Sequence, residues 1–206
     1  MEVVVVSTHL DDAVLSAWSV LGAHGARVVT VFTGGPPPGG LTSWDAGSGA
    51  PDSATRMEQR RCEDAAALAL AGCDFEHLDL QEAQYGAGQC PPEALAASIA
   101  GAEVVYAPAG IGEPHVNREH IVVRDAVLSL RPDAWLYADQ PYCNFSPATE
   151  LPGSPRERVL VTLPDELRSS KAEAIRRYAG ELWKLERDFG AFARPDRLAY
   201  EVLWSP

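Results

Sequence analysis

The stretch VVVVSTHLDD, residues 3–12 of this 206-residue chain, decides the fold. Four consecutive β-branched valines predict a parallel strand that is buried on both faces of a sheet. In open α/β sheets, ligands bind just beyond the carboxyl ends of such strands. The strand is predicted over residues 2–7, so His9, Asp11 and Asp12 follow it at the position where a site is expected.

A helical pattern begins after the two aspartates, with apolar residues at positions 13, 14, 15, 18 and 21. The pattern predicts one helix that ends near Gly22 or Gly25, with Asp11 or Asp12 as its N-cap. Adjacent side chains at the start of a helix diverge by roughly 100°. We therefore expect one aspartate to bind a cation while the other stays free for proton transfer.

Segments typical of strands and of helices alternate along the rest of the chain, which indicates a doubly wound parallel sheet. The right-handed crossover rule makes a Rossmann-like strand order the expected one. The prediction is an α/β fold: a single Rossmann-like domain over residues 1–206, with a mostly parallel central sheet and helices on both faces. Further strands are predicted at 27–33, 75–80, 103–107, 134–137, 159–163 and 198–203, and helices at 54–71, 92–99, 118–130 and 164–189.

The composition excludes several classes of partner. A net charge of −12 and a pI of about 4.8 argue against nucleic acid and anionic membranes, since both select clustered Lys and Arg. The four cysteines are widely spaced without a C-x-x-C pair, so we interpret them as reduced and mostly packed in the core. The chain shows no apolar run of about 18 residues and no charged-then-apolar leader. We expect it to stay in the cytoplasm, and no feature indicates an oligomeric state.

Residues 34–53 form a connection far longer than the usual loop between a strand and a helix, and they are rich in Gly, Pro and Ser. The connection leaves the carboxyl end of a predicted strand, on the same edge as the first motif. Trp44 offers an apolar plate and Asp45 a hydrogen-bond acceptor. The connection is therefore expected to form one wall of a substrate pocket, and a mobile surface insertion is the alternative.

A second segment with two histidines, His115 and His120, follows the predicted strand at 103–107 and leads into a helix. In a doubly wound sheet this strand and the first strand are neighbours at the topological switch point, so the loops after them face one crevice. Three of the five histidines then meet two aspartates on one edge of the sheet. His24 and His77 are interpreted as structural.

Imidazole together with carboxylate suits Zn²⁺, and three protein ligands with an open position are typical of a catalytic site. The predicted ligands are His9, Asp12 and His120, a set that Fe²⁺ or Co²⁺ also accepts. Zinc lowers the pKa of a bound water to about 7. Asp11 is the expected general base, because a base has to reach the water rather than the metal. His115 is placed to supply a proton or, as the imidazolium, to stabilise an oxyanion.

The run Thr-His-Leu-Asp-Asp-Ala at residues 8–13 resembles the Ala-His-Pro-Asp-Asp-Glu signature of the PIG-L, or LmbE-like, zinc-dependent N-deacetylases, which hydrolyse N-acetylglucosamine-type amides. The His-x-x-His segment of that family is similar to residues 115–126, and the order of the helices agrees over most of the chain. The resemblance implies the same zinc ligands and base, and it adds Arg60 and Glu82 as contacts to the sugar. An arginine beside Glu63 on an amphipathic helix is equally typical of a solvated ion pair.

The sequence departs from the family pattern at several positions. Leu10 and Ala13 replace a proline and a glutamate that bind no metal. Four residues instead of two separate His115 from His120, and Asn117 occupies the family's usual spacing. The position that stabilises the transition state therefore falls on His115 or on Asn117.

The sequence thus predicts a zinc-dependent amidohydrolase that removes an acyl group, typically acetyl, from the nitrogen of an amino sugar or of a sugar-containing small molecule, as in secondary metabolism or a thiol pathway. Tyr142, after the predicted fifth strand, lines the pocket or is a core residue with its hydroxyl at the surface. The nearer alternative is a zinc amidase that acts on a non-sugar amide or carbamate. The distant alternative is a non-catalytic Rossmann-like binding protein, but the first strand lacks the G-x-G-x-x-G turn, and paired aspartates repel phosphate.

Overall fold

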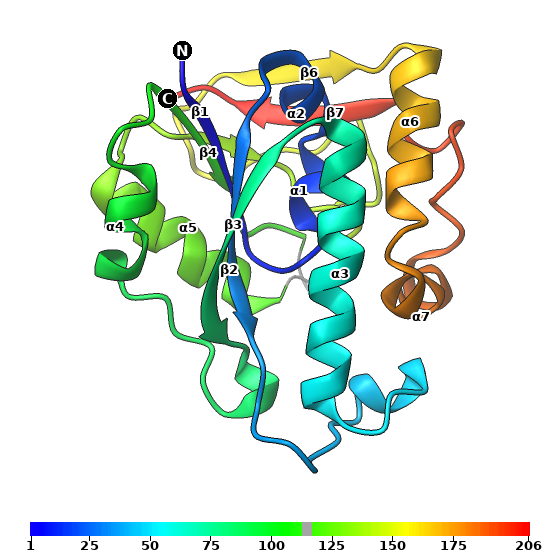
Figure 1. Ribbon diagram of the computed structural model, residues 1–206. Coiled ribbons are helices and arrows are strands. Elements are labelled where there is room, and N and C mark those ends of the chain that lie inside the picture. Colours follow the sequence, from blue (N-terminus) through cyan, green and yellow to red (C-terminus); the bar gives the residue numbers. More distant parts are fainter. Residues whose placement is uncertain (113–116) are drawn as a thin grey trace.

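The computed structural model describes residues 1–112 and 117–206, and the strands within these ranges form a seven-stranded sheet in the order β3-β2-β1-β4-β5-β7-β6 (Figure 1). Strands β1 to β5 are parallel, and β7 runs antiparallel to both of its neighbours. The predicted α/β class, with a mostly parallel sheet in a Rossmann-like order, is confirmed. The strands are β1 (Val3–Ser7), β2 (Arg27–Gly34), β3 (Asp74–Gln81), β4 (Val104–Pro108), β5 (Trp135–Tyr137), β6 (Arg158–Thr162) and β7 (Tyr200–Trp204).

Strand β1 lies in the middle of the sheet because its valines have to be buried on both sides. Val3 and Val5 belong to one core cluster, and Val4 and Val6 belong to the cluster on the opposite face. This alternation is what the pleat of a strand imposes. Burial of each valine side chain stabilises the fold by about 1.5–3 kcal/mol, so the run acts as the central element of both cores.

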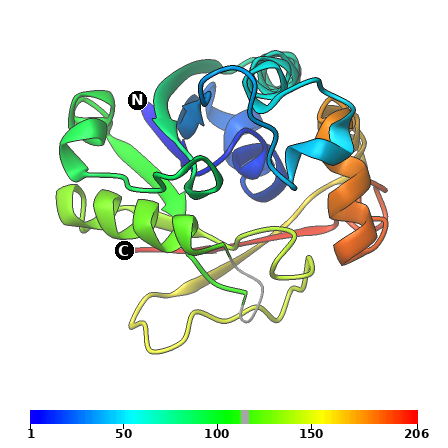
Figure 2. The same cartoon turned by 90° about the horizontal axis from the view of Figure 1, so that it is seen from below.

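The helices cover both faces of the sheet. Helices α1, α2, α3 and α6 pack on one face and α4 and α5 on the other (Figure 1). The chain leaves β1 toward one face and the neighbouring β4 toward the other, and this divergence opens a crevice at the edge seen in Figure 2. The helices are α1 (Asp12–Ser16), α2 (Trp18–His24), α3 (Ser53–Ala71), α4 (Pro92–Ile99), α5 (Arg118–Leu130), α6 (Asp165–Ile175) and α7 (Ala179–Phe189), with short 3-10 helices η1 (Asp45–Ser48) and η2 (Ala83–Tyr85).

The single helix predicted after the aspartates is two helices, α1 and α2, which are separated at Ala17. The backbone amides of Trp18 and Ser19, at the start of α2, donate hydrogen bonds to the carboxylate of Glu201 on β7, at 2.8 and 2.9 Å. The free amides of a new helix start are therefore satisfied by a side chain far away in the sequence. The local pattern of apolar residues does not reveal such a break.

The helix predicted from 164 to 189 is likewise divided, into α6 and α7. Tyr178, in the break, is buried, and its hydroxyl donates a hydrogen bond to Asp64 of α3 at 2.8 Å. Because of the break, α7 turns away from the axis of α6 and lies at the edge where the parallel strands end (Figure 1). This placement brings α7 to the candidate site.

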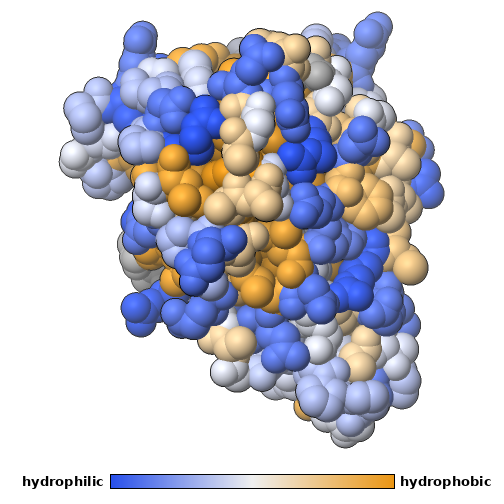
Figure 3. Space-filling model, turned by 60° about the vertical axis from the view of Figure 1, so that its left-hand side comes forward, coloured by the Kyte–Doolittle hydropathy of each residue, from blue (hydrophilic) through white to orange (hydrophobic). Residues whose placement is uncertain are grey.

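Figure 3 shows apolar residues in the middle of a largely hydrophilic face of the molecule. Scattered apolar residues on a surface are normal in folded proteins. In the part of the chain that the structure describes, no helix is long and apolar enough to cross a membrane.

Candidate active site

The three predicted metal ligands lie together at the carboxyl edge of the sheet: His9, Asp12 and His120. All three are buried, and their ligand atoms lie within 4.8 Å of one another. His9 lies in the connection from β1 to α1, Asp12 is the first residue of α1, and the first turn of α5 supplies His120. The structure thus brings together residues 108 or more positions apart because β1 and β4 are neighbours.

The arrangement of donor atoms fits a divalent cation. Oδ2 of Asp12 lies 3.2 Å from Nδ1 of His9 and 3.5 Å from Nε2 of His120. Nε2 of His120 is buried and has no hydrogen-bond partner among the described residues. A buried polar atom without a partner costs free energy. Two imidazoles and one carboxylate around such an atom are a donor set that transition metals bind.

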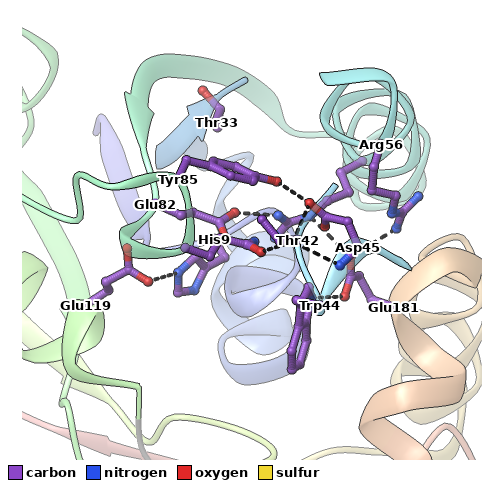
Figure 4. Close-up of polar contacts among 12 residues, drawn as sticks. His9, Thr33, Thr42, Trp44, Asp45, Arg56, Glu82, Tyr85, Glu119 and Glu181 are labelled. Carbon is purple, nitrogen blue, oxygen red and sulfur yellow. Dashed lines mark hydrogen bonds and ion pairs between the residues drawn. The ribbon is translucent and has the colours of Figure 1, made fainter. Parts of the chain in front are cut away.

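Two further carboxylates hold the imidazole rings. Nε2 of His9 lies 3.0 Å from Oε2 of Glu119 (Figure 4), and Nδ1 of His120 lies 2.8 Å from Oδ1 of Asp139. Each carboxylate engages one ring nitrogen and leaves the other facing Asp12. Carboxylates in this position fix the tautomer and the orientation of a metal-binding histidine.

The sequence analysis missed both of these carboxylates, although each leaves a signal. Asp139 follows β5 by two residues, at the edge where the other site residues lie, and Glu119 directly precedes His120. A search for carboxylates at the ends of all parallel strands identifies Asp139. Glu119 is identified by its place in the first turn of α5.

The charges of this group balance one another. Although burial opposes protonation, Asp12 and Glu119 raise the pKa of His9 well above its usual value. Burial also opposes protonation of His120. The carboxylates of Asp12 and Asp139 outweigh burial and raise the pKa of His120. Burial favours the neutral form of Asp12, but His120 and His9 outweigh burial and lower the pKa of Asp12. Positive charge is therefore favoured at the centre of the group, which is what a site for a cation requires.

Asp11 lies beside this group and lines the cavity. It occupies the N-cap position of α1, which begins at Asp12, but its side chain makes no capping hydrogen bond. Burial, followed by repulsion from Asp12, raises the pKa of Asp11 to about 8. The two adjacent carboxylates therefore differ in their surroundings: Asp12 contacts the imidazoles, whereas Asp11 lines the cavity and makes no capping hydrogen bond.

A cavity of about 900 Å³ opens in front of the group. Four of the five predicted substrate contacts line it: Trp44, Arg60, Glu82 and Tyr142. The fifth, Asp45, does not, because its buried carboxylate accepts hydrogen bonds from Thr42 Oγ1 at 3.0 Å and from the Tyr85 hydroxyl at 2.9 Å (Figure 4). The 3-10 turn η1 directs Asp45 into the protein, where it fastens the long loop to η2.

Arg60 is a buried residue of the cavity wall and not a solvated ion-pair residue, with 5% of its surface exposed. It forms an ion pair with Glu82, and its Nε lies 3.4 Å from Oε1 of Glu181 (Figure 4). Glu63, its suspected partner on the same helix, pairs with Arg56 instead, at 2.9 Å. Arg60 is thus held in place by two carboxylates that also line the cavity.

Glu181 lines the cavity, and no pattern in the sequence indicates that it does. It lies in the first turn of α7, and only the break after α6 brings this helix to the site. Asn117 also lines the cavity, at the N-cap of α5. Its Oδ1 accepts from the backbone N–H of Glu119, and its Nδ2 donates to Oε2 of the same residue, both at 3.0 Å. His115 lies outside the described residues.

The sequence matches no protein-family model and no curated protein. Solved structures do match over nearly the whole chain. The zinc-inhibited form of teicoplanin deacetylase Orf2 is 25% identical, with 99% of this chain and 97% of that chain covered and a TM-score of 0.81. The A40926 pseudoaglycone deacetylase Dbv21 is 26% identical, with 99% and 96% covered and a TM-score of 0.73. The N,N'-diacetylchitobiose deacetylase from Pyrococcus horikoshii shares the fold at 12% identity, with 94% and 75% covered and a TM-score of 0.66.

These matches confirm the prediction of an amidohydrolase with this fold. They also confirm the similarity to the PIG-L, or LmbE-like, deacetylase superfamily, because the matched deacetylases belong to it. The similarity to Orf2 and Dbv21 extends over 99% of the chain, so it includes both segments that carry the candidate site.

Proposed function

We propose that this protein is a zinc-dependent deacetylase that removes an acetyl group from the amide nitrogen of an amino sugar or of a small molecule that contains one. The observation that carries the proposal is the buried Nε2 of His120. This atom has no hydrogen-bond partner among the described residues and lies 3.5 Å from Oδ2 of Asp12. Two imidazoles, one carboxylate and an open side are typical of catalytic zinc. Fe²⁺ and Co²⁺ accept the same donors, and zinc is our choice because of its preference for nitrogen ligands in a four-coordinate site.

His9, Asp12 and His120 would hold the cation, while Glu119 and Asp139 keep the two rings in place. When bound, such a cation polarises an amide carbonyl and makes a water molecule more acidic. The carboxylate of Asp11 accepts the proton that the attacking water loses. It returns this proton to the amide nitrogen as the C–N bond breaks, so that acetate and a free amine leave.

We assign recognition of the sugar to Trp44, Arg60, Glu82 and Tyr142. A hydroxylated ring needs hydrogen-bonding groups and an apolar plate, and these side chains supply both to one cavity. Burial and the carboxylates of Asp12 and Asp11 raise the pKa of Tyr142 well above its usual value, so its hydroxyl remains a donor at neutral pH. The polar groups would orient the ring, and the indole would cover one side of it.

For stabilisation of the oxyanion we retain His115. The alternative, Asn117, uses both atoms of its side-chain amide on Glu119, which leaves it committed to holding that carboxylate. An imidazolium offers a full positive charge to a developing oxyanion, whereas an amide offers only a dipole, and this difference favours His115. A His115→Ala variant that keeps its metal but hydrolyses amides at least about 100-fold more slowly supports this assignment.

The names of the matched deacetylases refer to teicoplanin, to an A40926 pseudoaglycone and to N,N'-diacetylchitobiose. We propose that the substrate of this chain is likewise an N-acylated sugar or a small glycoside. The four free cysteines are those of a protein kept in a reducing compartment, so we propose that it works in the cytoplasm.

Metal analysis of the purified protein and amine release from N-acetylglucosamine, N,N'-diacetylchitobiose and simple N-acetylamines test the proposal together. Asp11→Asn should keep its metal and lose hydrolysis by about 100- to 10,000-fold, the contribution of a general base. Asp133→Asn is the matched control, because this aspartate is exposed and pairs with Arg131. An active Asp11→Asn protein would show that the mechanism is wrong, and hydrolysis of non-sugar amides alone would favour the amidase alternative.

A further inference from the structure

The long loop at 34–53 is fastened to α7 at three points. Nε1 of Trp44 donates to Oε2 of Glu181 at 2.8 Å. Nζ of Lys184 donates to the carbonyl oxygen of Trp44 at 3.2 Å and lies 3.5 Å from the centroid of the indole. Gly47 approaches Trp183 so closely that a Cβ at Gly47 would lie 2.3 Å from Cζ2 of that ring. These contacts favour a fixed wall over a mobile insertion.

Glu181 connects this loop to the rest of the cavity wall. Its carboxylate is 5% exposed and lines the cavity. One oxygen accepts from Trp44, and the other lies 3.2 Å from Nη2 of Arg56 and 3.4 Å from Nε of Arg60 (Figure 4). A buried carboxylate that accepts two hydrogen bonds and has a second guanidinium beside it is held in one conformation. Glu181 therefore fixes the ring nitrogen of the indole, while Lys184 of the same helix lies over the ring.

The side chain of Trp44 is partly buried against the core and borders the cavity. Lys184 lies over the ring but does not line the cavity, whereas Trp44 does. The ring surface that Lys184 leaves uncovered is the surface available to a ligand. A pyranose presents a flat face of C–H groups, which loses contact with water when it packs on an aromatic ring.

We propose that Glu181 is a positioning residue that holds the indole of Trp44 as a wall of the cavity, and that the uncovered face of Trp44 stacks on the sugar ring of the substrate. The inference rests on the proposed function, because it assigns the stacking to the sugar of that substrate. It adds a determinant of specificity on α7, a helix that carries none of the metal ligands.

A stacking contact of this kind exists before and during the reaction. It therefore contributes equally to the ground state and the transition state, and its loss raises KM while kcat stays unchanged. An acyclic amide has no ring to stack, so its hydrolysis does not depend on Trp44. This contrast separates recognition of the ring from damage to the metal site.

The test compares the KM and kcat of variants on N-acetylglucosamine, on N,N'-diacetylchitobiose and on the acyclic N-acetylethanolamine. Trp44→Ala should raise the KM of the sugars by about tenfold, the upper range for an aromatic contact, and leave kcat and the acyclic amide unchanged. Trp44→Phe keeps a ring but removes the donor to Glu181, and it should raise the KM by about threefold. Trp135→Phe, on β5, is the matched control, because Trp135 stacks on Tyr106 and does not line the cavity.

The role of Glu181 is tested by rescue. Glu181→Ala should raise the KM of the sugars at least as much as Trp44→Ala, whereas Glu181→Gln should restore part of the affinity, because its single amide oxygen accepts either from the indole or from Arg56. Sugar binding should also change the tryptophan emission of the wild type and not that of Trp44→Phe. A KM that Trp44→Ala leaves unchanged, or an equal loss on sugar and acyclic amide, overturns the inference alone. A wild type that hydrolyses neither sugar overturns the proposed function and the inference with it.

Discussion

Nδ1 of His120 lies 2.8 Å from Oδ1 of Asp139, and the two side chains are 1% and 0% exposed. The other oxygen of Asp139 accepts from the backbone N–H of Ile111 at 3.0 Å. One carboxylate at the end of β5 thus fixes both the ring of His120 and the start of the loop after β4. The orientation of Nε2 toward Asp12 depends on this residue, which lies outside the two segments that carry the predicted ligands.

Replacing this carboxylate should weaken metal binding without unfolding the protein. We expect Asp139→Asn to bind zinc about 10- to 100-fold more weakly, because an amide neither fixes the tautomer of His120 nor increases its basicity. Competition against a coloured chelator measures the affinity. Asp133→Asn, an exposed aspartate on the connection before β5, should bind zinc like the wild type. Equal affinities for both variants would contradict the role of Asp139.

Removing the metal should lower the melting temperature. His9, Asp12 and His120 come together only in the folded chain, so a cation that they hold binds the folded state and stabilises it. At a free zinc concentration 100 times the Kd, binding stabilises the fold by about 2.7 kcal/mol, which is roughly 5–10 °C for a chain of this size. Calorimetry with and without chelator measures the shift. His120→Ala should show no metal-dependent shift, and a shift of the same size in that variant would place the metal elsewhere.

Breaking the buried ion pair between Lys171 and Glu201 should destabilise the fold strongly. Nζ and Oε1 are 2.6 Å apart and both side chains are 0% exposed. Lys171→Met leaves the carboxylate of Glu201 without its cation, at a cost of about 3–5 kcal/mol in the free energy of unfolding. Urea denaturation measures this loss.

Two further variants show whether the loss of stability comes from the buried ion pair. Removing the exposed partner of Glu173 with Arg177→Met should change the free energy of unfolding by less than about 1 kcal/mol. Adding Glu201→Gln to Lys171→Met should recover part of the loss, because no charge is then buried alone. If Lys171→Met is as stable as Arg177→Met, the pair does not hold α6 to β7.

Reaction with iodoacetamide at pH 8 should modify one cysteine of the folded protein. Burial raises the pKa of Cys73 and Cys90 to about 11 and that of Cys143 to about 12. A raised pKa keeps a thiol protonated at pH 8, and the thiolate is the reactive form. Cys62 is exposed. Mass spectrometry should find one modification in buffer and four in urea, and none in buffer for Cys62→Ser; fast labelling of Cys143 in buffer would contradict the packing described.

Much of the fold follows from short-range pattern. The run Val3–Val6 indicates a strand buried on both faces, and the structure places it between β2 and β4. The helices predicted at 92–99 and 118–130 have the same bounds as α4 and α5. These features are readable because the period of apolar residues reflects which faces of an element are buried.

The candidate metal group was also readable in the sequence, because its members follow the ends of β1 and β4. The orientation of Asp45 could not be predicted from the sequence. Trp44 and Asp45 are neighbours, yet the first lines the cavity and the second is turned inward by η1 and held by Thr42 and Tyr85. Both residue types suit a sugar pocket, and only the turn decides which one reaches it.

The Rossmann-like order of the parallel strands, the edge of the sheet that carries the site, and the group His9, Asp12 and His120 could be predicted from the sequence without the structure. The tertiary structure alone decided where helices break and which distant side chains complete the site. Glu201 divides α1 from α2, and the break at Tyr178 brings Glu181 to the cavity. The physical reason is the distance along the chain over which each feature is determined. Neighbouring residues determine which face of an element is buried, whereas a hydrogen bond between residues more than 100 positions apart forms only after the sheet has packed.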